Sequence, residues 1–237
     1  MSRTIPKDYA SLISFLEKYT LNDKLADQDF APLLKGIHKR YLALLTLLAE
    51  VETQANDSRL LQDPNFLQTH SYFKESISDI GSSYFCFIHG TIKPSKIMIR
   101  SSIETIIKGI TANEFPNVLV SKSVFGVLDE AKKTAFFQRQ IEGKLFAQLE
   151  TIYGELCKDV HTATTKNMAH VSALNTFPSF DKQSSSEAKK IIIDTSRIVL
   201  AIGCIFYKNY FLKMHFENKE IVTASLDKSI KKYLNGH

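Results

Sequence analysis

Residues 30–52, FAPLLKGIHKRYLALLTLLAEVE, carry the most regular pattern in the chain. Apolar side chains recur there at three- and four-residue spacing, from Leu33 through Ile37 and Tyr41 to Leu48. That spacing places them on one face of a helix, which must be buried against another element. The stretch therefore predicts a fold built from packed amphipathic helices.

The same periodicity continues on both sides of this stretch. The 237 residues include only nine glycines and six prolines, and 44% are hydrophobic, which supplies enough material for a core. We therefore predict an all-α helical bundle, with an N-terminal helical hairpin in residues 1–65 and a main bundle in residues 66–237. The approximate ranges expected to be helical are 6–19, 30–52, 69–89, 97–110, 121–132, 136–160, 186–217 and 223–234.

Local signals indicate where some of these helices begin and end. Gly90 suits the end of the helix over 69–89, because glycine tolerates the left-handed backbone found there. Pro94 suits the first turn of the helix that follows. The tract that begins at Ser184 and ends at Glu187 is expected to supply the N-cap of the helix over 186–217.

The composition favours a cytoplasmic protein. Three cysteines, Cys86, Cys157 and Cys204, lie within helical pattern, and their odd number fits reduced thiols. The N-terminus has charges where a signal peptide would be apolar, so export is not expected. The longest apolar run, Ile198 to Tyr207, has ten residues, whereas a membrane-spanning helix needs about 20. We expect no membrane span, and a buried central helix over this run.

The positive charge is concentrated near the C-terminus. The net charge is +5, and residues 189–237 account for all of it, with nine basic and four acidic side chains. One interpretation is a solvated basic face on the C-terminal helices. The alternative is a surface for RNA or DNA, since phosphate neutralisation gives sequence-independent affinity. The lysines that would form such a surface are Lys189, Lys190, Lys208, Lys213, Lys228, Lys231 and Lys232.

Two charged residues lie inside an apolar stripe. Arg100 and Glu104 are four residues apart, so on a helix they share one face and can form an ion pair. Ile103 and Ile107 place the pair close to the core. Because a buried charge persists only when it is paired, we expect this polar core pair to orient neighbouring helices. A functional role would require a cleft beside it.

A second polar group recurs at helical spacing in Tyr153, Cys157 and His161. A thiol and an imidazole one turn apart could hold a metal or act as nucleophile and base. Cys86 and His89 form another such couple, so a shared site across two helices is conceivable. Structural zinc normally uses ligands on tight turns, so we expect no metal and no cofactor, and interpret the cysteines as small core residues.

The segments Arg100-Ser-x-Ile-Glu104 and Tyr153-x-x-Leu-Cys-x-x-Val-His161 resemble the helical HEPN-type proteins of bacteria and archaea, over roughly residues 70–215. The resemblance implies a small helix bundle, often dimeric, from toxin–antitoxin, abortive-infection or other antiviral defence systems. Some members are metal-independent ribonucleases with an Arg-x4-6-His motif, and others are non-catalytic binding modules. At the matching positions this chain has Lys158, Asp159 and His161, with lysine in place of arginine and a shorter spacing. The resemblance would make His161 a general acid or base and Lys158 the cation that stabilises charge.

Because no complete catalytic motif is present, we expect a helical accessory or effector subunit of a prokaryotic defence-type system. It would act mainly through protein–protein contacts, with another protein or in a homodimer. We expect the turn with Arg100 and Glu104 to meet the turn from Tyr153 to His161 inside one cluster of helices. One alternative is therefore a HEPN-like ribonuclease that uses Lys158, Asp159 and His161, with Arg100 and Glu104 across the bundle, whose RNA cleavage would disappear in His161→Ala. The other is a nucleic-acid-binding subunit that uses the basic C-terminal region, whose binding would weaken steeply with salt.

Overall fold

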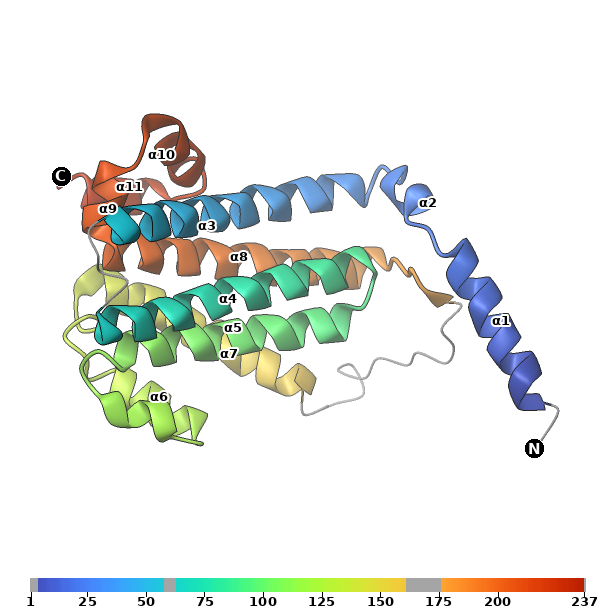
Figure 1. The fold of residues 1–237 in the computed structure, drawn as a ribbon, viewed down its shortest axis with the longest axis horizontal. Coiled ribbons are helices and arrows are strands. Elements are labelled where there is room, and N and C mark those ends of the chain that lie inside the picture. Colours follow the sequence, from blue (N-terminus) through green and yellow to red (C-terminus); the bar gives the residue numbers. More distant parts are fainter. Residues whose placement is uncertain (1–3, 58–62, 161–175, 237) are drawn as a thin grey trace.

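The computed structural model describes residues 4–57, 63–160 and 176–236, and every element in these ranges is helical, as predicted. Long helices lie side by side in a bundle, and shorter ones connect or flank them (Figure 1). The elements are α1 (Thr4–Lys18), α2 (Asn22–Leu25), α3 (Ala31–Asp57), α4 (Pro64–Ile88), α5 (Ile92–Thr111), the short 3-10 helix η2 (Pro116–Val120), α6 (Val124–Ala131), α7 (Gln140–Val160), α8 (Lys182–Phe206), α9 (Lys208–Lys213), α10 (Phe216–Thr223) and α11 (Lys228–Leu234).

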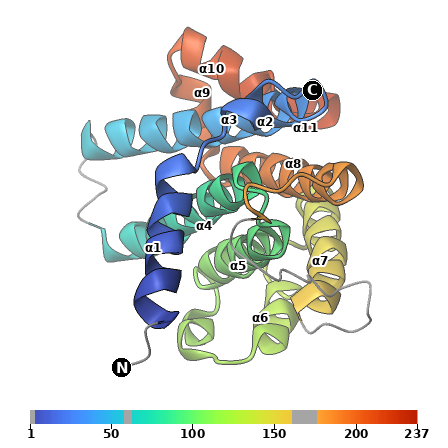
Figure 2. The same ribbon diagram turned by 90° about the vertical axis from the view of Figure 1, so that its right-hand side faces the viewer.

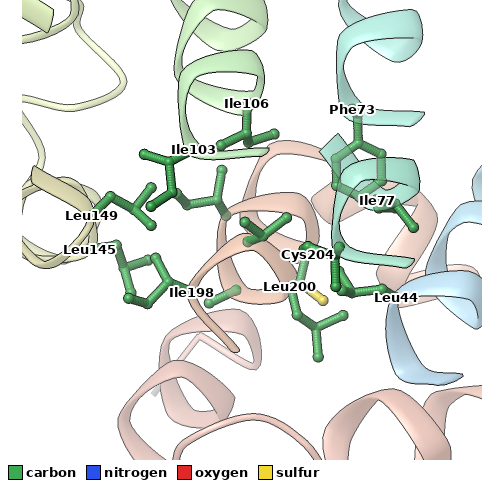
Figure 3. Packing of buried hydrophobic residues seen from close by; sticks show 14 of the residues in the cluster. Leu44, Phe73, Ile77, Ile103, Ile106, Leu145, Leu149, Ile198, Leu200 and Cys204 are labelled. Carbon is green, nitrogen blue, oxygen red and sulfur yellow. The ribbon is translucent and has the colours of Figure 1, made fainter. Parts of the chain in front are cut away.

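Helix α8 is the centre of the bundle. It packs against α3, α4, α5 and α7, and Figure 2 shows it surrounded by them when the bundle is viewed end-on. All its residues from Ile198 to Ile205 are buried, which confirms the prediction of a buried central helix over the longest apolar run. Figure 3 shows how the neighbouring helices contribute to the same core around Ile198, Leu200 and Cys204, through Leu44, Phe73, Ile77, Ile103, Ile106, Leu145 and Leu149.

Helices α4 and α5 form a closely packed hairpin, and small polar side chains lie along the contact. The hydroxyls of Ser76 and Ser102 are 2.8 Å apart, and those of Ser83 and Ser95 are 2.9 Å apart. All four serines are buried. Because serine is small and finds its hydrogen-bond partner within the contact, the two helices approach closely without leaving a buried hydroxyl unpaired.

The helix ends agree with the sequence signals in part. Gly90 follows α4 with a φ of +73°, which confirms the predicted left-handed residue. Helix α4 begins earlier than expected, because the Asp63 side chain accepts a hydrogen bond from the Asn65 amide at 3.0 Å and Pro64 occupies the first turn. The cap expected within the tract from Ser184 is wrong. Asp181 caps α8 instead, accepting from the Ser184 amide at 2.7 Å.

The single helix predicted over 186–217 is also wrong, because α8 ends at Phe206. The chain bends at Tyr207, whose φ and ψ of −95° and 35° are not helical, and continues as α9 and α10. Tyr207 and Phe211 are both buried, and the ring of Tyr207 lies 5.3 Å from that of Phe73. The bend therefore lets the end of the chain fold back and bury these aromatic rings.

The N-terminal region differs from the predicted hairpin. Helix α3 packs along α8 and contributes Ile37, Leu44 and Leu47 to the core of the main bundle. Helix α1 leaves the end of the bundle at an angle, away from α3 (Figures 1 and 2). The apolar stripe of α3 is long enough to be shared with several helices, so burial in the main core is favoured over a pairing with the shorter α1.

Candidate functional site

The polar core pair of α5, Arg100 and Glu104, contacts Tyr153 of α7. Nε of Arg100 lies 3.0 Å from Oε1 of Glu104, one helical turn away. The Tyr153 hydroxyl donates to that Oε1 at 2.9 Å and accepts from Nη2 of Arg100 at 3.1 Å. The guanidinium carbon also lies 5.3 Å from the centre of the Tyr153 ring. The three side chains form a closed triangle that joins α5 to α7.

The surroundings of this triangle fix its charge state. Burial raises the pKa of the Tyr153 hydroxyl, and the hydrogen bond to Glu104 raises it further. Burial opposes the charge of Arg100, but the bond to Tyr153 and the charge of Glu104 raise the pKa of the guanidinium on balance. At neutral pH the triangle is therefore a neutral phenol between a cation and a carboxylate. The two opposite charges lie within the group, and its hydrogen bonds hold α5 against α7.

Asp79 of α4 belongs to the same region and was not predicted from the sequence. The side chain is buried, and its Oδ2 has no hydrogen-bond partner among the described residues. Burial raises the pKa of Asp79, and the charges of Glu75 and Glu104 raise it further, whereas a bond with Ser101 opposes the shift. The available signal was the position of Asp79 between Ile77 and Ile80, on the stripe that α4 turns toward the core.

A second ion pair lies one turn before Arg100 on α5. Nζ of Lys96 is 2.8 Å from Oδ2 of Asp159 on α7, and both side chains are less than one-fifth exposed, at 17% and 18%. Asp159 was a candidate ribonuclease residue, and here it holds α7 against α5. Lys158, its neighbour, is exposed, and His161 lies outside the described residues. The structure therefore brings Asp159 to a partner, Lys96, that was not predicted from the sequence.

A pocket of about 350 Å³ opens beside Glu104, between α4, α5 and the segment that leads into α6. Nζ of Lys108 donates to the Ser121 carbonyl at 3.3 Å at its edge. The cleft that a functional role of the Arg100–Glu104 pair would require is thus present next to one member of the pair. The residues that line it are Tyr72, Glu104, Thr105, Lys108, Ser121, Val124 and Val127.

The thiols and imidazoles do not gather into a metal centre within the described ranges. No group of three or more histidine, cysteine, aspartate or glutamate side chains there could hold a metal ion. Nδ1 of His89 lies 2.5 Å from the Tyr19 hydroxyl, which gives this ring a partner other than Cys86. Cys204 is buried in the core, as expected of a small hydrophobic residue, whereas Cys86 and Cys157 are partly exposed.

The seven C-terminal lysines do not lie in one place. Lys189 and Lys190 are near the start of α8, and Lys208 follows its end, which at 1.5 Å per helical residue is about 27 Å away. Lys208 lies over the Tyr233 ring at 5.7 Å, so α9 and α11 are in contact at that end. Lys213, Lys228, Lys231 and Lys232 also belong to this C-terminal group. The predicted basic surface is therefore split between two ends of the bundle.

In the part of the chain that the structure describes, no helix combines the length and hydrophobicity needed to cross a membrane. No protein-family model, curated protein or solved structure matches the chain.

Proposed function

We propose that this chain is a helical subunit that acts through protein–protein contacts, as an accessory or effector component of a prokaryotic defence-type system. The observation that carries the proposal is the exposed apolar stripe of α1. The defence context comes from the resemblance of residues 70–215 to HEPN-type proteins.

Helix α1 has an apolar stripe of the kind that is usually buried against another surface. Tyr9, Ile13 and Leu16 are spaced by four and three residues, so they share one face, and they are 62%, 37% and 55% exposed. None of the side chains described in α1 is buried. Helices that dock into grooves of partner proteins present anchors at this spacing. A stripe that the chain does not bury is thus a candidate contact surface.

The charged residues next to the core support a binding role over catalysis. Arg100 and Glu104 are paired with each other and with Tyr153, and Asp159 is paired with Lys96. A ribonuclease built on Lys158, Asp159 and His161 would need Asp159 to leave that ion pair. We therefore expect purified protein to leave RNA intact. Cleavage that disappears in His161→Ala would overturn the proposal in favour of the ribonuclease alternative.

Site-specific photo-crosslinking tests the contact role directly. A photoreactive phenylalanine analogue replaces Leu16 on the exposed stripe or, as the control, Lys18 on the opposite face of α1. We expect covalent adducts with a protein from position 16, because a docked stripe is shielded from water, and few or none from position 18. The absence of protein adducts from position 16 in cells would contradict the proposed function.

A further inference from the structure

The occupant of the α1 stripe can be inferred from a second apolar surface on the same chain. This surface is a groove between the last turns of α4 and the first turns of α5, with a volume of about 320 Å³. Phe85 and Ile97 on its walls are 63% and 36% exposed, although both are large and apolar. The residues that line the groove are Ser82, Phe85, Cys86, Pro94, Ile97 and Met98, and none of them carries a charge.

Helix α1 is tied to the bundle beside this groove, but its stripe lies elsewhere. The Tyr19 hydroxyl is 2.5 Å from Nδ1 of His89, and the two rings are stacked at 5.6 Å. His89 in turn contacts Phe85, with ring centres 4.4 Å apart. From this anchor α1 runs away from the bundle (Figure 1), so Ile13 and Tyr9 lie about 9 and 15 Å further along the helix. Among the residues that the structure describes, only α4 and α5 line the groove, and none of α1 does.

Stripe and groove match in chemistry. Both are apolar, and helix α1 carries two lysines and two acidic residues, Lys7, Lys18, Asp8 and Glu17, so its formal charge is zero. Two copies of a chain with net charge +5 repel each other, but this contact would bring together an uncharged groove and a helix without net charge. The described residues that line the groove offer no counter-charge to a nucleic acid or a strongly charged peptide.

We infer that the groove is filled by α1 of a second copy of this chain. In this dimer Tyr9, Ile13 and Leu16 of each copy pack on Phe85 and Ile97 of the other. A two-fold axis relates the two identical contacts, so both stripes are covered and the assembly stops at two copies. The anchor and the groove lie at the same end of the bundle, which lets two copies meet through these ends. The inference rests on the proposed function and names the partner.

Disulfide trapping tests the exchange, because Cys86 already lines the groove. Ile13→Cys, mildly oxidised, is expected to give a covalent dimer whose disulfide joins the introduced thiol to Cys86. Lys18→Cys, on the other face of α1, and the double variant Ile13→Cys/Cys86→Ser are expected to stay free of that bond. A bond between residues 13 and 86 within one chain, a bond between the two introduced thiols, or neither bond would overturn the inference.

Solution mass gives an independent reading. Under reducing conditions we expect a mass twice that of the 26.9 kDa chain, falling two-fold in Leu16→Glu and in Phe85→Glu. Both positions are exposed, so circular dichroism should show an unchanged fold. A wild-type monomer at all concentrations would overturn the inference. If that monomer still crosslinks from position 16 to other proteins, the proposed function stands without the dimer, whereas no adduct of any kind would contradict both.

Discussion

Helices α4 and α5 bury polar side chains against each other, whereas α1 leaves apolar ones in water. Ser76, Ser83, Ser95 and Ser102 are buried in the first contact, and Tyr9 and Leu16 are more than half exposed on α1. The hydrophobicity of these side chains alone would predict buried tyrosine and leucine and exposed serines. The difference shows that burial depends on whether a complementary surface is within reach on the same chain. Within the described ranges, helix α1 has the stripe but no such surface lies against it.

The largest expected effect comes from shortening a buried side chain of α5, compared with the same change on α1. Ile103 of α5 is fully buried, so Ile103→Ala should lower the free energy of unfolding by about 3 kcal/mol, through lost burial and the cavity left behind. Leu16→Ala removes a similar apolar side chain from α1 and should change it by less than about 0.5 kcal/mol. Urea denaturation at a concentration where the chain is monomeric measures both. Similar costs would mean that α1 is buried in the monomer.

A second substitution tests how close α4 and α5 must be. A Cβ at Gly109 would lie only 2.5 Å from Cβ of Tyr72, so Gly109→Ala should destabilise the protein by about 2 kcal/mol. Gly154 of α7 is the matched control, because a Cβ there meets nothing within 4 Å. Gly154→Ala should stabilise the protein by about 0.5–1 kcal/mol through helix propensity. Equal effects in denaturant titrations would contradict the tight contact.

The smallest expected effect concerns Asp79, the carboxylic acid that α4 buries near its contact with α5. Burial raises the pKa of Asp79, so its protonated form stabilises the fold, and this stability is lost as the pH rises through the folded-state pKa. Asp79→Asn should therefore raise the free energy of unfolding by about 1 kcal/mol at neutral pH. The gain should shrink toward acidic pH, where wild-type Asp79 is protonated. Glu75→Gln, at an exposed neighbour on α4, serves as the control.

A gain from Asp79→Asn that persists unchanged at low pH would show that geometry, rather than charge, limits this site. An equal gain from Glu75→Gln would point to general charge repulsion on α4 instead of the burial of one carboxylate.

Periodicity predicted the long helices, because each must turn an apolar face to the core. It could not predict the bend at Tyr207, since the run from Cys204 to Asn235 contains neither glycine nor proline and the bend serves the burial of Tyr207 and Phe211. The four-residue spacing of Arg100 and Glu104 indicated their ion pair. The sequence also predicted that the turn with Arg100 and Glu104 meets the turn with Tyr153, and the hydrogen bonds to Tyr153 confirm this. The Lys96–Asp159 ion pair was not predicted, because only the register of α5 on α7 brings these two side chains together.

The central position of α8 has a consequence for synthesis of the protein on the ribosome. Helices α3, α4, α5 and α7 all precede α8 in the chain, and each packs on it. At about 5–20 residues per second, roughly 8 to 30 seconds separate the synthesis of Ala31 at the start of α3 from that of Lys182 at the start of α8. During that time these helices lack the neighbour that completes their core. The nascent chain is therefore expected to depend on chaperones until α8 emerges.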